Sequence, residues 1–305
     1  MTLQRSLSPR AWAELVLLSA IWGGSFLSIR IALDAVPVLW AVTHRVFWAA
    51  LALWALVLLR GLPLPRGGRI WGAFLVMGLL NNAIPFTLMA WGQLHIETGL
   101  TAILNAATAI WGVLVAALVF ADERLSLRKA AGVGLGFLGV ATAIGLEALT
   151  RFDLRSAAQL AVLAGTLSYA FAGSWARAQL TGVPPLVSAT GMLTASSALL
   201  VPLALVLDGP PSLALPASAW GAIAYYALAA TAFAYLLYYR VLAMAGAGNL
   251  LICTLLIPPV AIVLGTVVRG EALLPQAYAG FALLGLGLAI LDGRPLAWIG
   301  RRFSV

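Results

Sequence analysis

The chain has 305 residues, of which 63% are hydrophobic and 9% are charged, and its formal net charge is +8. A water-soluble domain carries roughly 25% charged residues, so this composition excludes a soluble protein with a hydrated shell. Several long tracts contain no Asp, Glu, Lys or Arg, and about 20 apolar residues in a helix suffice to cross a bilayer. Because a helix satisfies its backbone hydrogen bonds internally, the sequence predicts an all-α polytopic membrane protein.

Charged, proline-rich or glycine-rich breaks separate these tracts and leave no room for a soluble domain. The first 30 residues resemble a signal peptide, but no small-residue cleavage site leaves the pattern intact, so we expect them to be retained. The breaks divide the chain into ten predicted transmembrane helices, at about residues 11–31, 38–59, 70–94, 98–120, 130–148, 157–179, 186–207, 217–239, 247–268 and 274–293.

The basic residues are distributed unevenly between the two sides of these helices. With ten spans, 13 of the 18 Lys and Arg residues fall in loops or termini on one side and four on the other, while Arg45 lies within a span. Cytoplasmic loops carry the basic excess, so both termini are predicted to be cytoplasmic. The positive charge is expected to contact anionic lipid headgroups, and the chain offers no basic face of a folded soluble surface for nucleic acid.

The two halves of the chain repeat one another. The sequence WGGSF at residues 22–26 returns 149 positions later as FAGSW at residues 171–175. Residues 1–150 and 151–305 are therefore predicted to be two five-helix repeats, and the odd number of helices inverts the second relative to the first. Inverted repeats are typical of secondary transporters, whose substrate site lies between the halves near the midplane. A shift of 148 positions superposes Pro37 on Pro185, Glu123 on Glu271, Gly132 on Gly280 and Gly139 on Gly287.

Small and aromatic residues share one face of the first predicted helix and of the sixth. Glycine and serine let a neighbouring backbone approach closely, which alone would explain them. The aromatic rings either occupy lipid-facing positions or form the wall of a cavity. The candidates for this wall are Trp22, Ser25, Phe26, Phe171 and Trp175, with Gly24 and Gly173 as structural or gating residues.

Polar side chains and prolines also occur at depth in four other helices. Facing lipid they would be costly, so they are expected to form bonds between helices or to contact a ligand. The proline pair is predicted to interrupt its helix, and Tyr239 is equally well explained as an interfacial residue. The candidate ligand-binding residues are Asn82, Pro85, Met89, Asn105, Thr108, Trp111, Tyr235, Tyr238, Tyr239, Cys253 and Pro258, with Pro259 as a structural or gating residue.

Arg45 is the one charge placed inside a predicted span, where it must snorkel, pair, or face water in a structural, gating or substrate role. The two histidines stand apart, the acidic residues lie at span ends or in loops, and no Walker motif occurs. We therefore expect no catalytic residue, no metal and no cofactor, and the protein is predicted not to be an enzyme. The glycines from Gly132 to Gly139 predict close helix packing, within the chain or between two chains.

Taken together, the ten spans, the inverted duplication, WGGSF, Pro37 followed by Arg45, and the Glu123–Arg124–Leu125 turn resemble the EamA branch of the drug/metabolite transporter superfamily. More narrowly, the chain resembles the YddG type, bacterial inner-membrane exporters of aromatic amino acids that also pass other amino acids and cationic drugs. The resemblance implies a basket-like fold with a central cavity lined by the first, third, fourth, sixth, eighth and ninth helices. One departure is Leu193, which replaces the counterpart of Arg45 in the second repeat.

The function expected from these features is export of aromatic and other apolar amino acids, and of cationic drugs such as viologens, across the bacterial inner membrane. The lack of an acid at depth predicts downhill flux by alternating access. The alternative is an exporter of another small metabolite or a multidrug carrier, with proton coupling. The expected partners are the small solute and membrane lipids, and the expected state is a monomer or weak homodimer.

Overall fold

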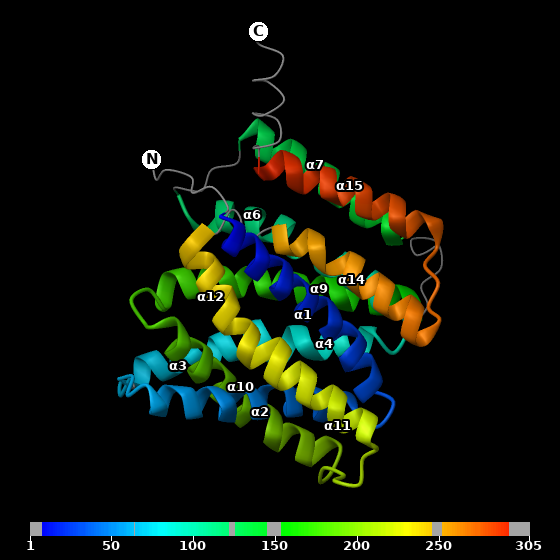
Figure 1. Cartoon of the computed structure of the whole chain (residues 1–305). Coiled ribbons are helices and arrows are strands. Elements are labelled where there is room, and N and C mark those ends of the chain that lie inside the picture. Colours follow the sequence, from blue (N-terminus) through cyan, green and yellow to red (C-terminus); the bar gives the residue numbers. More distant parts are fainter. Residues whose placement is uncertain (1–7, 64, 122–125, 145–153, 246–251, 293–305) are drawn as a thin grey trace.

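The computed structural model describes residues 8–63, 65–121, 126–144, 154–245 and 252–292, within which the chain is helical and contains no strand. The elements, seen in Figure 1, are α1 (Pro9–Ala32), α2 (Val38–Leu59), α3 (Gly68–Gly78), η1 (Leu79–Ala83), α4 (Ile84–Gly92), α5 (Thr98–Asn105), α6 (Thr108–Val119), α7 (Leu127–Ile144), α9 (Leu154–Gln179), α10 (Pro185–Leu207), α11 (Ala217–Ala224), η2 (Tyr225–Phe233), α12 (Ala234–Ala245), α14 (Ile252–Arg269) and α15 (Pro275–Asp292).

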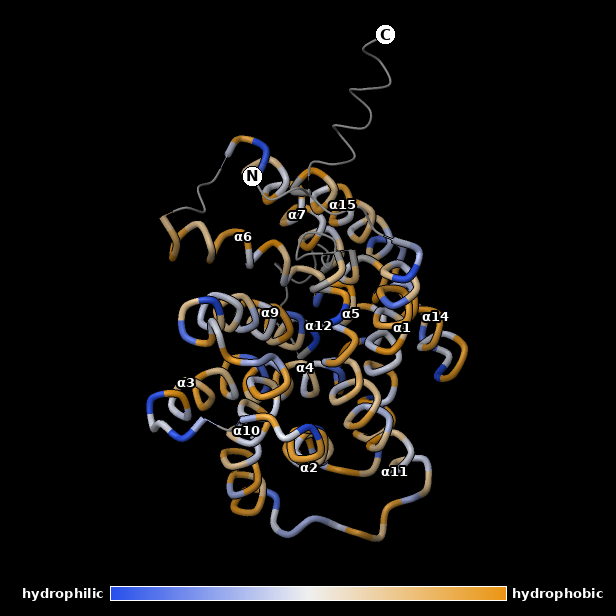
Figure 2. The backbone as a smooth tube through the Cα atoms, turned by 60° about the vertical axis from the view of Figure 1, so that its left-hand side comes forward, coloured by the Kyte–Doolittle hydropathy of each residue, from blue (hydrophilic) through white to orange (hydrophobic). Residues whose placement is uncertain are grey.

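Six stretches of helix are long and apolar enough to cross a membrane, at residues 9–32, 38–59, 68–92, 98–119, 185–207 and 217–238. Two shorter apolar helices cover residues 256–269 and 275–290. The helices are mostly orange in Figure 2, and the most hydrophilic stretches lie mainly at their connections. The chain is therefore a multi-pass membrane protein, and each predicted tract coincides with helix in the described residues. The turn at residues 122–125, which includes Glu123, lies outside the described residues.

Two antiparallel helix pairs form opposite flanks of the bundle: α7 packs on α15, and α2 packs on α10 (Figure 1). The α7–α15 contact is a seam of glycines. A Cβ on Gly139 would lie 2.5 Å from the backbone nitrogen of Leu284, and a Cβ on Gly287 would lie 2.7 Å from that of Gly136. Only glycine permits this approach, so the glycine-rich stretch of the first half packs within the chain.

Irregular turns interrupt several helices at depth. In η1 and η2 the backbone adopts the wider π-helical turn. In η2 the Thr231 hydroxyl donates to the carbonyl of Tyr226, five residues earlier, at 2.8 Å. Between α5 and α6, the Thr108 hydroxyl donates to the carbonyl of Asn105 at 2.7 Å. The side chains thus satisfy carbonyl groups where the helical ladder changes register.

The proline pair behaves differently from its prediction. α14 runs without a break from Ile252 to Arg269 and contains both Pro258 and Pro259. The predicted interruption at these residues is therefore wrong. Proline removes one donor at each position but leaves φ compatible with a helix, and the other hydrogen bonds of the 18-residue α14 maintain it.

Candidate functional site

A cavity of about 600 Å³ lies inside the bundle and is lined by residues of α1, α2, α3, η1, α4, α5, α6, α9, α10, η2, α12 and α14. Its wall mixes rings, amides, hydroxyls and small residues. The structure brings ten of the sequence-predicted residues together in this wall, namely Trp22, Ser25, Phe26, Arg45, Met89, Asn105, Thr108, Gly173, Tyr235 and Tyr238.

The other predicted residues lie outside the described lining. Asn82, fully buried, donates to the Ser196 hydroxyl at 2.9 Å, and the Trp175 indole donates to the carbonyl of Ala73 at 3.1 Å. Their contacts join helices and leave the groups no part in the cavity wall. Outside the lining with them are Gly24, Pro85, Trp111, Phe171, Cys253, Pro258 and Pro259, whereas the side chain of Tyr239 is not among those that the structure describes.

Contacts with other helices also account for most of the rest of this group. A Cβ on Gly24 would lie 2.5 Å from the Tyr225 hydroxyl oxygen, and the Cys253 sulfur accepts a hydrogen bond from Ser19 at 3.1 Å. Trp111 packs edge-on against Phe137 with ring centroids 4.8 Å apart. Pro85 packs against Gly165 of α9, while Phe171 is 46% exposed on the outside of the bundle.

The π turn explains why Asn81, and not Asn82, faces the cavity. A regular α-helix would place residues 82 and 89 on one face, because seven residues complete almost two turns. The wider turn of η1 takes up an additional residue, so the face of Met89 continues to Asn81. The π turn could not be seen from the hydrophobic period alone.

α9 presents a different face from the one that the repeated motif indicates. The cavity-facing residues Tyr169, Gly173 and Ala176 lie 147 positions after Trp22, Phe26 and Ile29 of α1. The offset of 149 that aligns WGGSF with FAGSW instead matches Phe171 to Trp22 and Trp175 to Phe26, and so predicts that Phe171 and Trp175 face the cavity. The motif matches in sequence, but the helix is rotated, so sequence reasoning missed Tyr169.

Arg45 occupies the wall without an acidic partner. Its Nε donates to the Thr231 hydroxyl at 3.0 Å, and its guanidinium carbon lies 3.9 Å from the centre of the Phe86 ring. The terminal nitrogens of Arg45 have no hydrogen-bond partner among the described residues, since its one hydrogen bond there is made by Nε. It is the only charged side chain in the described lining.

Further wall residues were missed at the sequence level. Asn81 donates to the Tyr235 hydroxyl at 3.3 Å, and the Gln93 amide donates to the carbonyl of Phe26 at 2.9 Å. Gln93 is 1% exposed and its Oε1 has no partner in the described structure. A polar residue near a span end is ordinary in sequence, and only the neighbouring helices reveal that Gln93 closes one end of the cavity.

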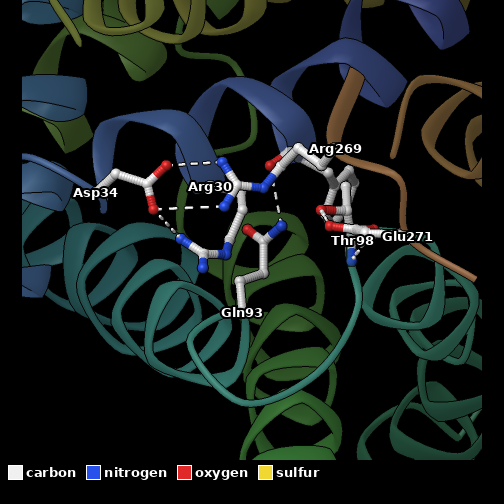
Figure 3. Close-up of polar contacts among 7 residues, drawn as sticks. Arg30, Asp34, Gln93, Thr98, Arg269 and Glu271 are labelled. Atoms are coloured by element: carbon white, nitrogen blue, oxygen red, sulfur yellow. Dashed lines mark hydrogen bonds and ion pairs between the residues drawn. The ribbon is translucent and has the colours of Figure 1, made fainter. Parts of the chain in front are cut away.

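That end, which we name the Asp34 end, is held by polar contacts between helix termini (Figure 3). The Asp34 carboxylate accepts from Arg30 at 2.6 Å and from Arg269 at 2.7 Å, which joins α1 to α14. Glu271 accepts from both the backbone N–H and the hydroxyl of Thr98, at 2.8 and 2.7 Å, and so joins the α14–α15 connection to α5.

A bidentate ion pair adds to these contacts: Arg155 of α9 binds both carboxylate oxygens of Glu97 at 3.1 and 2.9 Å.

Partial burial raises the pKa of the Asp34 carboxyl, but the hydrogen bonds from Arg269 and Arg30 outweigh it, so that the net pKa lies below its usual range. The Asp34 carboxylate therefore stays charged, and its ion pairs with Arg30 and Arg269 persist, throughout the neutral pH range.

The opposite end of the cavity, the Val183 end, reaches the surface. Its lining continues through Leu180 and Val183 to the exposed Pro185 at the start of α10. The lining therefore includes an exposed residue at the Val183 end, whereas ion pairs between helix termini lie at the Asp34 end. Among the described residues, no group of three His, Cys, Asp or Glu side chains could hold a metal ion.

The comparisons with known proteins agree with this architecture. The EamA-like transporter family matches the chain twice, at residues 11–145 and 156–291. The chain belongs to this family. EamA-like chains that resemble it include a probable terminal-alkyne amino-acid exporter of Streptantibioticus cattleyicolor, 28% identical and covering 97% of this chain and 96% of that protein.

The uncharacterized inner membrane transporter YedA of Escherichia coli K12 is 27% identical to this EamA-like chain, over 86% of the chain and 84% of YedA. A solved crystal structure of a protein superposes with a TM-score of 0.66 and 19% identity, covering 94% of this chain and 98% of its own. That likeness concerns the fold. The family and these relatives indicate a membrane transporter and not an enzyme.

Proposed function

We propose that this EamA-like protein exports amino acids with aromatic or other apolar side chains across the bacterial inner membrane. The observation that carries the proposal is the central cavity of about 600 Å³, which is lined by aromatic rings together with amides, hydroxyls and one arginine. Trp22 and Tyr238 lie with ring centroids 6.0 Å apart in this wall and would bury an apolar side chain, while the polar groups would bind an amino acid's charged end.

The proposed architecture is ten spans in two inverted repeats, residues 1–150 and 151–305. Pairs of packed helices support it, because exchanging the halves turns the α1–α14 contact into the contact of α9 with α5 and α6, while α2–α10 and α7–α15 exchange into themselves. The two π-helical turns also correspond, because subtracting 148 from the positions of η2 gives a range that contains η1. The cavity would then lie on the seam between the repeats.

Both termini are placed in the cytoplasm because basic residues concentrate in the loops of that side. The Val183 end of the cavity would then face the cytoplasm, and the Asp34 end would be the closed external gate. Export by alternating access would require the contacts of Asp34, Glu97 and Glu271 to break while the Val183 end closes.

The flux is proposed to be downhill. A proton relay generally needs a carboxylate or histidine inside the membrane, and the described lining contains neither. Glu14, the single acidic residue of α1, is instead paired with Arg10 and Arg240. Exchange in proteoliposomes should continue when an ionophore collapses the pH gradient, and its loss would show coupling to protons.

The test of function is counterflow. Proteoliposomes preloaded with unlabelled phenylalanine should accumulate external radiolabelled phenylalanine, and tryptophan, leucine and a terminal-alkyne amino acid should compete. The alkyne belongs in the panel because the relative from Streptantibioticus carries that name. No amino-acid exchange by the wild-type protein would refute the proposal. Exchange of a different small metabolite or of an organic cation would favour the alternative of another export substrate.

A further inference from the structure

The cavity wall contains an arginine with unused hydrogen-bonding capacity. Arg45 lies seven residues into α2, at a depth of roughly 10 Å along the helix axis, and contributes to the wall. An arginine at depth in a membrane protein normally pairs with an acid or faces water. Arg45 uses Nε on Thr231 and one face of the guanidinium on Phe86, which leaves its terminal nitrogens for another acceptor.

These two contacts also fix the position of the guanidinium. The Phe86 ring supports the planar group at 3.9 Å, and the hydroxyl of Thr231 is itself oriented by its bond to the Tyr226 carbonyl. A planar guanidinium held in this way presents two parallel N–H donors, the arrangement that matches a carboxylate. A small point charge such as ammonium would not offer this fit.

The same cavity wall also contains a hydrogen-bond acceptor. Tyr235 follows Thr231 by about one helical turn, and neighbours at that spacing are roughly 5–6 Å apart between Cβ atoms. Tyr235 binds the Nδ2 of Asn81, whose Oδ1 has no donor among the described residues. The arginine and the amide oxygen thus lie in the wall of the same cavity.

Resting on the proposed function, we infer that Arg45 is the carboxylate-binding residue of the export site and that Asn81 Oδ1 accepts from the substrate's ammonium. The substrate class is then a zwitterionic amino acid with a free carboxylate. Organic cations are disfavoured, because the described lining has a positive charge and no acidic side chain. This inference narrows the range of substrates, since aromatic walls alone would suit cations.

Competition for counterflow of radiolabelled L-phenylalanine by the wild-type protein tests the inference without any mutation. Phenethylamine and phenylalanine methyl ester, which lack the carboxylate, should compete at least about tenfold more weakly than phenylalanine, the loss expected for a hydrogen-bonded charge. 3-Phenylpropanoate, which keeps only the carboxylate, should compete better than phenethylamine. Equal competition by phenethylamine or the ester would overturn the inference while leaving amino-acid export intact.

Variants then assign the residues. Arg45→Gln should reduce phenylalanine affinity about tenfold or more and abolish the preference for phenylalanine over phenethylamine, and Arg45→Lys should restore part of both. Arg60→Gln, the same change at the exposed end of α2, is the control. A folded Arg45→Gln protein that keeps the preference would show that Arg45 only supports the helices. If this variant does not fold, the competition series decides.

Asn81→Leu tests the ammonium site separately. It should weaken competition by phenylalanine several-fold and leave competition by 3-phenylpropanoate unchanged. Equal loss for both ligands would overturn the role of Asn81. Failure of the wild-type protein to exchange any amino acid would instead refute the proposed function, and this inference with it.

Discussion

If the Asp34 end is the external gate proposed above, neutralising Asp34 should open it more often. Its carboxylate holds Arg30 of α1 and Arg269 of α14 at the Asp34 end (Figure 3). The Arg30 pair is local to the end of α1, so only the Arg269 pair crosses between helices. An exposed or partly exposed ion pair contributes about 0.2–1 kcal/mol, so Asp34→Asn should remove about that much from the closed state. Because about 1.4 kcal/mol corresponds to a factor of ten, the closed-to-open ratio should fall by about 1.4–5-fold.

The assay is thiol labelling from outside the cell. A cysteine at Ile29, which lines the cavity, is introduced into a Cys253→Ser background, since Cys253 is the single native cysteine. A membrane-impermeant maleimide reaches position 29 only when the Asp34 end opens, so its labelling rate should rise by the same factor. Asp208→Asn, at an exposed residue with no ion pair among the described contacts, is the matched control. An unchanged rate in Asp34→Asn would refute the gate.

The same assay has a defined pH dependence. The pKa of Asp34 in the closed state lies below its usual value of 3.8. A lowered pKa means that the stabilisation is fully present above the usual value and is lost as the pH falls through the lowered one. Maleimide reacts with the thiolate, whose fraction falls with pH, so the rate at position 29 is divided by the rate for a fully exposed reference cysteine at each pH. This ratio should be constant from neutral pH to about pH 5 and rise only in stronger acid, and a rise near pH 6 would point to another group.

Two packing predictions remain. Gly24→Val should lower stability by about 1–3 kcal/mol, because its Cβ would meet Tyr225 at 2.5 Å, whereas Gly173→Val, with no atom within 4 Å of its Cβ, should keep stability and reduce exchange by filling the cavity. Asn82→Ala should cost about 1–3 kcal/mol through the lost bond to Ser196 without changing substrate affinity. Thermal unfolding in detergent measures the stability of each variant, and counterflow measures exchange by Gly173→Val. Unchanged unfolding midpoints in Gly24→Val or Asn82→Ala would contradict the packing described.

Helix positions were predictable from sequence because the membrane imposes a strong rule on composition. The predicted tract 38–59 coincides with α2, and α10, at residues 185–207, begins one residue before the predicted tract 186–207 and ends with it. Charge, proline and glycine mark the places where a chain leaves the bilayer. Such a signal is local, and a single sequence therefore contains it.

The faces of the helices were harder to predict. The wall residues of α1, from Trp22 to Ile29, follow a regular helical period and were largely found. The π turn of η1 moves the cavity face from Asn82 to Asn81, and the rotation of α9 moves it from Phe171 to Tyr169. Register shifts of one or two residues leave the average hydrophobicity unchanged, so the sequence pattern does not reveal them.

The surroundings of Arg45 could not be predicted at all. Its partners Phe86 and Thr231 come from α4 and η2, far away in the chain. Sequence identifies an arginine at an unusual depth, but only the packing of three helices shows that no described carboxylate meets it. The unsatisfied group, and not the motif around it, therefore indicates the chemistry of the site.

The asymmetry between the two halves affects how cargo travels. Where the first half has Arg45, the corresponding position of the second has Leu193, which is completely buried. A pocket with two equivalent charges could hold a solute in either of two antiparallel poses. In the proposed mechanism, a substrate anchored by Arg45 alone would keep its carboxylate on the same wall in the inward-open and outward-open states. It would then cross the membrane without reversing its orientation, while the helices move around it.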